Sequence, residues 1–221
     1  MESFLCRELQ KSLGNSTVDM ASEVLRICES YYDKPVHNLL QLRQRNTKRK
    51  GDIFELFCAK YMRVCYGLPR VWLFSQIPAD IRQHLNLGTQ DMGIDLVGQD
   101  ADQNYYAIQS KYRKRNPNRK TGIGWKQLST FYALASRSGP YLKHIVFTSA
   151  DYARHIGKKS SQDQTLNFNS LLKITHFQWL EMAQINKVEL PKELFNSSPQ
   201  LTKAEVRAKR LLRFSSVQNE L

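Results

Sequence analysis

Gly93-Ile94-Asp95-Leu96-Val97 and Ala107-Ile108-Gln109-Ser110-Lys111 are the two stretches from which the architecture of this chain can be read. Both are short and rich in apolar, β-branched residues, and the polar segment 98–104 separates them. This pattern predicts two strands, 93–97 and 105–112, joined by a hairpin loop. Side chains alternate along a strand, so Gln109 and Lys111 are expected to share one face.

The polar residues of this predicted hairpin are suited to phosphodiester chemistry. With the turn at 98–104, Asp95 is expected opposite about Ala107, within diagonal reach of Gln109. A carboxylate, an amide oxygen and the Lys111 ammonium would then converge at one end of the hairpin. Hard oxygen ligands of this kind hold Mg²⁺, which lowers the pKa of an attacking water, and an ammonium stabilises developing charge. An isolated Asp or Lys is usually only a turn or surface residue, but an unpaired charge amid β-branched residues is costly.

The remaining segments predict a mixed central β-sheet flanked by helices, an α/β fold. Residues 1 to about 45 are expected to be helical, and a buried helix is expected from 52 to about 66. Further predicted strands are 71–76, 144–149 and 171–175, and further predicted helices are 125–135 and 177–183. We expect a helical N-terminal extension (1–45), a core (46–185) and a basic C-terminal tail (186–221) with one helix over about 202–214.

The charge balance favours a polyanionic partner. Thirty-three Lys and Arg against 20 Asp and Glu give a net charge of +13, and nucleic acid is the first candidate because neutralised phosphates release counterions. An anionic membrane surface is the competing interpretation, although no apolar window is long enough to span a bilayer and residues 1–8 do not resemble a signal peptide. The four cysteines form no C-x-x-C pair, which predicts a reducing intracellular setting without structural zinc.

Three motifs resemble a known nuclease family. They are Gly51-x-x-Phe54-Glu55 on a predicted helix, Asp91-x-Gly93-Ile94-Asp95, and Gln109-x-Lys111. In order and spacing they are similar to the motifs of Mrr-like nucleases within the PD-(D/E)XK, or restriction endonuclease-like, superfamily. The resemblance is strongest to the Mrr-type domain found N-terminal to some large helicases, and it covers residues 45 to 183.

The resemblance implies a catalytic set of Glu55, Asp95, Gln109 and Lys111. Asp95 would be the principal ligand of Mg²⁺ (or Mn²⁺), with Gln109, the Ser110 carbonyl and Glu55 as further ligands, and Lys111 would position the nucleophilic water. Gln109 stands where many relatives have Glu. A plain surface role for Glu55 stays open.

Asp91 is a supporting acid or a turn residue in this interpretation. The chain carries no Walker A motif, so no helicase engine is expected within it.

A basic loop follows the predicted catalytic strand and is the expected nucleic-acid contact. Its cations are Arg113, Lys114, Arg115, Arg119 and Lys120. A phosphate at Lys111 would leave the DNA backbone lying along this loop, although charge runs are often only solvated. The stretch 43–50 and the predicted tail helix are further candidates for DNA or partner contact.

We therefore expect a metal-dependent DNA endonuclease of the restriction or repair type. Two alternatives stay open: a structure-selective nuclease such as a Holliday junction resolvase, and a catalytically silent DNA-binding or packaging protein with the same fold. Expected partners are DNA, a second copy of the chain and a helicase or other nucleic-acid-processing protein, with no membrane. The expected location is intracellular, in a prokaryotic cytoplasm or in a nucleus or virion.

Overall fold

The computed structural model describes residues 1–184 apart from 16, 31–38, 91–92, 117 and 155–159, and for 39–45 it describes the backbone only. The chain divides into two units, Met1–Ile185 and Asn186–Leu221. All described elements belong to the first unit. Asp91 and the helix predicted at about 202–214 lie outside the described residues.

The first unit alternates helices and strands. In chain order the elements are α1 (Glu2–Leu13), α2 (Met20–Ser30), α3 (Leu39–Val64), β1 (Arg70–Leu73), a 3₁₀ turn (Phe74–Gln76), α4 (Ala79–His84), β2 (Leu96–Gln99), β3 (Tyr105–Lys111), β4 (Gly122–Ile123), a 3₁₀ turn (Trp125–Gln127), α5 (Ser129–Arg137), β5 (Lys143–Thr148), β6 (Tyr152–Ala153), β7 (Asp163–Leu166), α6 (Phe168–Leu171) and α7 (His176–Met182). None of the helices in the described part of the chain could cross a membrane.

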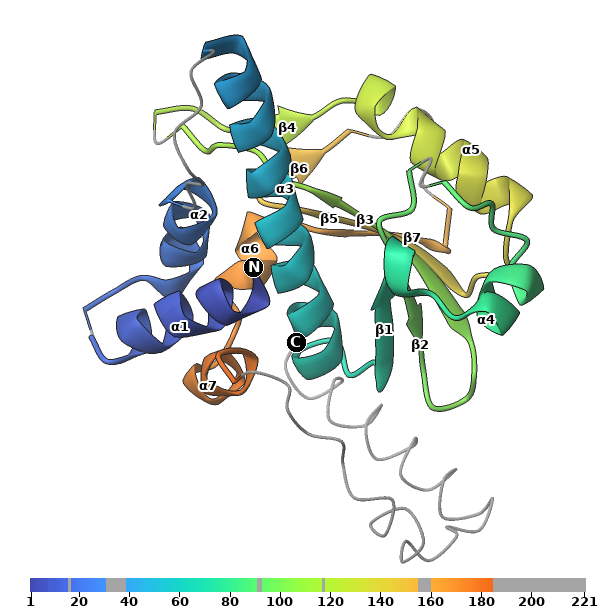
Figure 1. Cartoon of the computed structure of the whole chain (residues 1–221), viewed down its shortest axis with the longest axis horizontal. Helices are drawn as coiled ribbons and strands as arrows, with labels where there is room; N and C mark the ends of the chain where they lie inside the picture. Colours follow the sequence, from blue (N-terminus) through green and yellow to red (C-terminus); the bar gives the residue numbers. More distant parts are fainter. Residues whose placement is uncertain (16, 31–38, 91–92, 117, 155–159, 185–221) are drawn as a thin grey trace, which may run out of the picture. The chain divides into compact units, whose positions relative to one another are not determined.

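A five-stranded mixed sheet in the order β1-β2-β3-β5-β7 forms the centre of this unit. β1, β2 and β3 run antiparallel to one another, and β3, β5 and β7 run parallel. Helices α1, α2, α3 and α7 lie on one side of the sheet, and α4 and α5 lie on the other (Figure 1). The predicted mixed sheet flanked by helices is confirmed.

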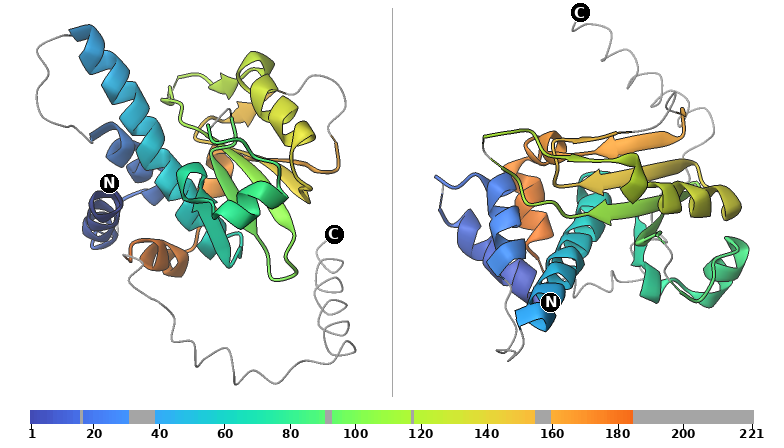
Figure 2. Two further views of the ribbon diagram at one scale, coloured as in Figure 1. Left: turned by 45° about the vertical axis from the view of Figure 1, so that its right-hand side comes forward. Right: turned by 90° about the horizontal axis from the view of Figure 1, so that it is seen from above.

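Because successive side chains of a strand point to opposite faces of the sheet, the core forms two layers. Leu96, Ile108 and Phe147 pack with Phe54 and Phe57 of α3. The intervening strand residues belong to a second layer with α4 and α5, whose members include Val97, Ala107, Val146 and Phe131. Burying each of the Leu, Ile, Val and Phe side chains contributes about 1.5–3 kcal/mol. Helices α1 and α2 lie beside α3 and share its layer (Figure 2).

Helix α3 is longer than predicted. The prediction began it at residue 52, but the helix begins at Leu39 and includes the whole basic stretch 43–50. Gly51 lies inside the helix, where a glycine costs only about 1 kcal/mol relative to alanine. Lys, Arg and Gln are good helix formers, so a basic stretch that resembles a loop by composition continues the helix.

The strand predicted at 171–175 is wrong. The strand at this side of the sheet is β7, whose sequence Asp-Gln-Thr-Leu is too polar to be recognised as a buried strand. The chain then forms α6, whose N-terminus is capped by Asn167, because the Asn167 side chain accepts a hydrogen bond from the Asn169 N–H. Leu171 ends α6, and residues 172–175 connect it to α7.

Candidate active site

Asp95 lies at a distortion in the hairpin of β2 and β3. The Asp95 N–H donates to the Ile108 carbonyl at 3.0 Å, although Leu96 already faces Ile108 in the ladder. Two residues of one strand therefore oppose one of the other, which is the arrangement of a β-bulge, a feature that redirects side chains next to active sites. The predicted register is wrong by two positions, because Val97, not Asp95, lies opposite Ala107.

The redirected Asp95 carboxylate lies at the end of β3. Its Oδ2 atom accepts a hydrogen bond from the Ser110 N–H at 2.7 Å. The carboxylate thus occupies the place that a backbone carbonyl would take if the ladder continued. This contact sets Asp95 directly beside Ser110, and Lys111 lines the same cleft.

Gly93 allows the chain to reach this position. It has a φ of +132°, and a Cβ atom there would lie 3.3 Å from the backbone nitrogen of Phe131 in α5. Only glycine adopts such a φ readily and tolerates so close an approach. The glycine two residues before Asp95 therefore fixes how the strand enters the site.

Two residues at the end of β5 fix the backbone at the C-terminal end of β3. The buried Thr148 donates from Oγ1 to the Lys111 carbonyl at 2.8 Å. Ser149, also buried, accepts from the Arg113 N–H at 2.6 Å and donates to the Arg113 carbonyl at 2.8 Å. The backbone on both sides of Tyr112 is therefore anchored by side chains that the sequence analysis did not identify.

Helix α3 supplies the opposite wall of the site. A cleft of about 480 Å³ lies between α3 and the end of β3, and its lining residues are Thr47, Lys50, Gly51, Asp52, Glu55, Asp95, Ser110, Lys111, Tyr112, Arg113 and Lys114. Four residues of the predicted site, Glu55, Asp95, Ser110 and Lys111, therefore line one cleft.

Asp52 is an acid in this cleft that the sequence analysis missed. It lies three residues before Glu55, so the two carboxylates share one face of α3. Burial raises the pKa of Asp52, and the charges of Lys48 and Arg49 oppose that rise. The i to i+3 spacing of Asp52 and Glu55 was the signal that could have revealed it.

Gln109 is buried and is not among the residues that line the cleft. Its residue is 3% exposed, and its Oε1 atom has no hydrogen-bond partner. Within the described residues, Arg115 Nε is the other buried side-chain atom in this condition. A buried amide oxygen without a partner costs free energy, so an acceptor free at this position fits a missing ligand such as a cation.

Carboxylates from α3 and from the hairpin both affect the pKa of one buried thiol. Cys58 of α3 is buried, and its pKa is raised by that burial and then by the nearby Cys28, Glu55 and Asp95. One buried thiol therefore lies close to the acids of both α3 and the hairpin.

The donor set suits a hard divalent cation. Within the described residues no group of three or more His, Cys, Asp and Glu side chains could hold a metal. The oxygens near the site are instead the carboxylates of Asp52, Glu55 and Asp95 on the cleft walls, the Ser110 carbonyl and the unpartnered Gln109 amide oxygen. Mg²⁺ is commonly bound through one or two carboxylates and several waters, so these residues fit it.

The predicted DNA-contact cations fall into three groups. Arg113 and Lys114 line the cleft, and Arg119 and Lys120 are exposed outside it. Arg115 is engaged within the chain, since it pairs with Asp151 at 2.7 Å and lies 3.5 Å from the centroid of the Phe168 ring. The structure therefore favours a role for Arg115 in holding the loop.

A comparison with known protein families identifies the family of this chain. A family model described as "Restriction endonuclease" (Mrr_cat_2) matches residues 65–189, more than half of the chain. A solved structure, "ATP-dependent Type ISP restriction-modification enzyme LlaBIII bound to DNA", is 19% identical with a TM-score of 0.40, and the alignment covers 59% of this chain but 8% of that one. No curated protein matched significantly. On the family match, the chain belongs to the Mrr-type restriction endonuclease family.

Proposed function

We propose that this chain is a metal-dependent endonuclease that hydrolyses phosphodiester bonds in DNA, with Asp95, Glu55, Gln109 and Lys111 as its catalytic set. The observation that carries the proposal is the single cleft in which a hairpin carboxylate, a helical carboxylate and a lysine meet. The family is one of restriction nucleases, and nucleases with this fold generally use divalent metals.

Each residue has a role that follows from its position. Asp95, the Ser110 carbonyl and the Gln109 amide would hold Mg²⁺ or Mn²⁺, and Glu55 would complete the set from α3. When bound, the cation supplies charge neutralisation at the phosphate and a more acidic water. Lys111 holds the attacking water or the developing negative charge from the end of β3. Asp52 adds negative charge to the α3 wall.

DNA is the proposed substrate because the cleft is bordered by cations on both sides. Lys50 lies on the α3 wall, and Arg113 and Lys114 lie on the β3 wall. A phosphate backbone entering between them would be neutralised while the scissile phosphate reaches Lys111. Cleavage of both strands by one site per chain would need two chains, and the homodimer remains part of this proposal.

The test is cleavage of supercoiled plasmid by the full chain with Mg²⁺, Mn²⁺ or EDTA. Wild type should nick the plasmid only with metal, and Asp95→Asn and Lys111→Ala should each lose at least about 10²-fold in rate, the range for removing a preorganised electrostatic group. Matched controls are Asp80→Asn on α4 and Lys126→Ala, which lie outside the cleft. DNA binding without cleavage in any metal would favour the silent binding protein instead.

A further inference from the structure

Tyr112 joins three parts of the molecule at the edge of the cleft. It directly follows Lys111 and lines the cleft beside it. Its ring packs edge-on against Phe54, the neighbour of Glu55, with the ring centroids 5.9 Å apart. Its hydroxyl donates to Glu29 Oε1 at 2.7 Å. The position of Tyr112 therefore depends on α3 and α2 together.

Glu29, in the N-terminal part of the chain, contacts two residues that line the cleft. It lies in the last turn of α2, and besides accepting from Tyr112 it pairs with Lys114 at 3.6 Å. Burial raises the pKa of Tyr112, and the hydrogen bond and charge of Glu29 raise it further, so the phenol remains a donor at neutral pH. One carboxylate thus contacts two residues of the cleft wall.

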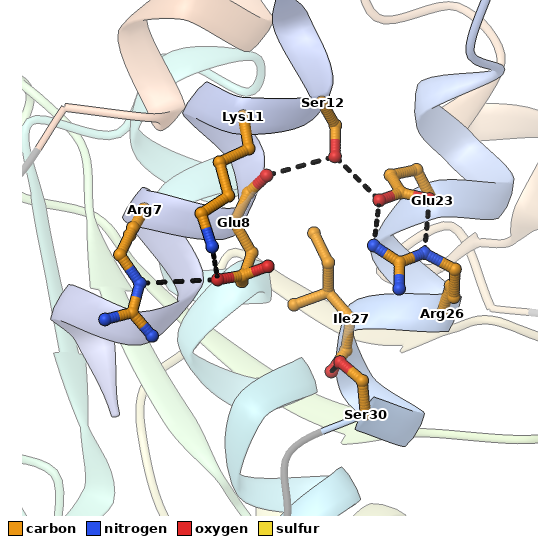
Figure 3. Close-up of polar contacts among 8 residues, drawn as sticks. All are labelled: Arg7, Glu8, Lys11, Ser12, Glu23, Arg26, Ile27 and Ser30. Carbon is orange, nitrogen blue, oxygen red and sulfur yellow. Dashed lines mark hydrogen bonds and ion pairs between the residues drawn. The ribbon is translucent and has the colours of Figure 1, made fainter.

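Helices α1 and α2 form a connected pair that supports Glu29. The Ser12 hydroxyl of α1 lies within hydrogen-bond distance of the Glu8 carbonyl and of the Glu23 carboxylate of α2, sharing its one hydrogen between them (Figure 3). Arg26 binds the same Glu23 carboxylate through two nitrogens. The pair also contributes Leu5, Leu9, Val24 and Ile27 to the core layer of α3. The family match begins at residue 65, so this support lies outside the matched region.

We propose that the N-terminal helix pair completes the nuclease site, with Glu29 as a positioning residue that holds Tyr112 and restrains Lys114. Through Tyr112, Glu29 sets the position of the adjacent Lys111 between β3 and α3. Through Lys114, the same carboxylate competes with DNA phosphate for a cation at the mouth of the cleft. This inference rests on the proposed nuclease function.

The two contacts predict different behaviour for three variants. Glu29→Ala and Tyr112→Phe both remove the hydroxyl contact and should lower kcat by about 10- to 100-fold, the scale of a small misplacement of a catalytic group. Glu29→Gln retains an acceptor for the hydroxyl and should recover most of the turnover lost in Glu29→Ala. Only the two Glu29 variants should bind DNA severalfold more tightly at low salt, because they release Lys114.

The experiment measures kcat on plasmid and Kd for a short duplex across a salt series, with the full chain and a melting curve for each variant. Glu8→Gln is the charge-matched control, since Glu8 pairs with Arg7 and Lys11 on α1. It should leave kcat and Kd at the wild-type values.

Equal kcat in wild type, Glu29→Ala and Tyr112→Phe would overturn the positioning role. Equal loss of kcat in Glu29→Ala and Glu29→Gln would also overturn it. If Glu8→Gln tightened DNA binding as much as Glu29→Gln, the effect would be general charge and not release of Lys114. Absence of cleavage by wild type would contradict the proposed function itself, which separates the two failures.

Discussion

The proposed metal ion bears most directly on Gln109. Its amide oxygen is buried without a partner, and a neutral oxygen coordinates a cation more weakly than a carboxylate would. A Glu at this position would place an uncompensated charge in the core when no metal is bound, and such charges are strongly destabilising.

We therefore expect Gln109→Glu to lower the Tm of the metal-free protein and to gain more Tm on addition of Mn²⁺ than wild type gains. A ligand that binds only the folded state stabilises it by RT ln(1 + L/Kd) at free ligand concentration L, so a tighter site gains more stability at the same concentration. The measurement is thermal unfolding in EDTA and across a Mn²⁺ titration. Gln99→Glu is the control, because Gln99 is also buried but faces Arg70 on β1, and its Tm should not depend on metal. If the Tm of Gln109→Glu did not change with Mn²⁺, the role of this position as a metal ligand would be contradicted.

At the level of elements, the site depends on how the chain enters β2. The bulge at Asp95 and the close approach of Gly93 to α5 are parts of one local geometry. The strand order alone would not aim the Asp95 carboxylate at the end of β3.

Gly93→Ala should destabilise the protein by about 1–3 kcal/mol, the usual cost of a non-glycine residue in such a conformation. For a chain of this size that corresponds to several degrees of Tm. Cleavage should fall as well, because Asp95 would move with the strand. Gly124→Ala is the matched control, since nothing lies near the added Cβ and its φ is −88°. Equal Tm for the two variants would show that the approach to α5 imposes no constraint.

Across the whole molecule, burial raises the pKa of most tyrosines and thiols in the described residues. Burial raises the pKa of Tyr61 and of Cys28 to about 12 in each case, and those of Tyr66, Tyr106, Tyr132 and Tyr141 are also raised, chiefly by burial. The ordinary values are 10.0 for tyrosine and 9.0 for cysteine.

The sign of the resulting pH dependence follows from proton binding. Because the folded state holds these protons more tightly than the unfolded state, their contribution to stability is complete below the ordinary values. It is lost as the pH rises from those values toward the folded ones. We expect the denaturation midpoint to fall steadily above about pH 9–10, and native phenolate absorbance to appear at higher pH than in concentrated guanidinium. Coincident native and denatured titration curves would refute this prediction.

Local patterns account for the hairpin and most of the site. Alternation, the polar segment 98–104 and the Gly93–Asp95 motif act over a few residues, so the two strands and the grouping of Asp95 with Lys111 could be predicted from sequence. The two-residue error in register arose because β2 runs on through Gly98 and Gln99, which the polar composition of 98–104 had assigned to the loop. Polar β7 was missed because its pairing with β5, not its composition, decides its structure. The early start of α3 was missed although its basic residues are good helix formers.

The proposed catalytic residues Glu55, Asp95, Gln109 and Lys111 could be named from the linear order of the motifs, because each motif requires particular side chains at short spacing. The tertiary structure alone placed Asp52 in the cleft, engaged Arg115 with Asp151 and brought Glu29 to Tyr112 across 83 positions of sequence. Contacts between distant segments depend on how helices pack on the sheet. No local periodicity encodes that packing.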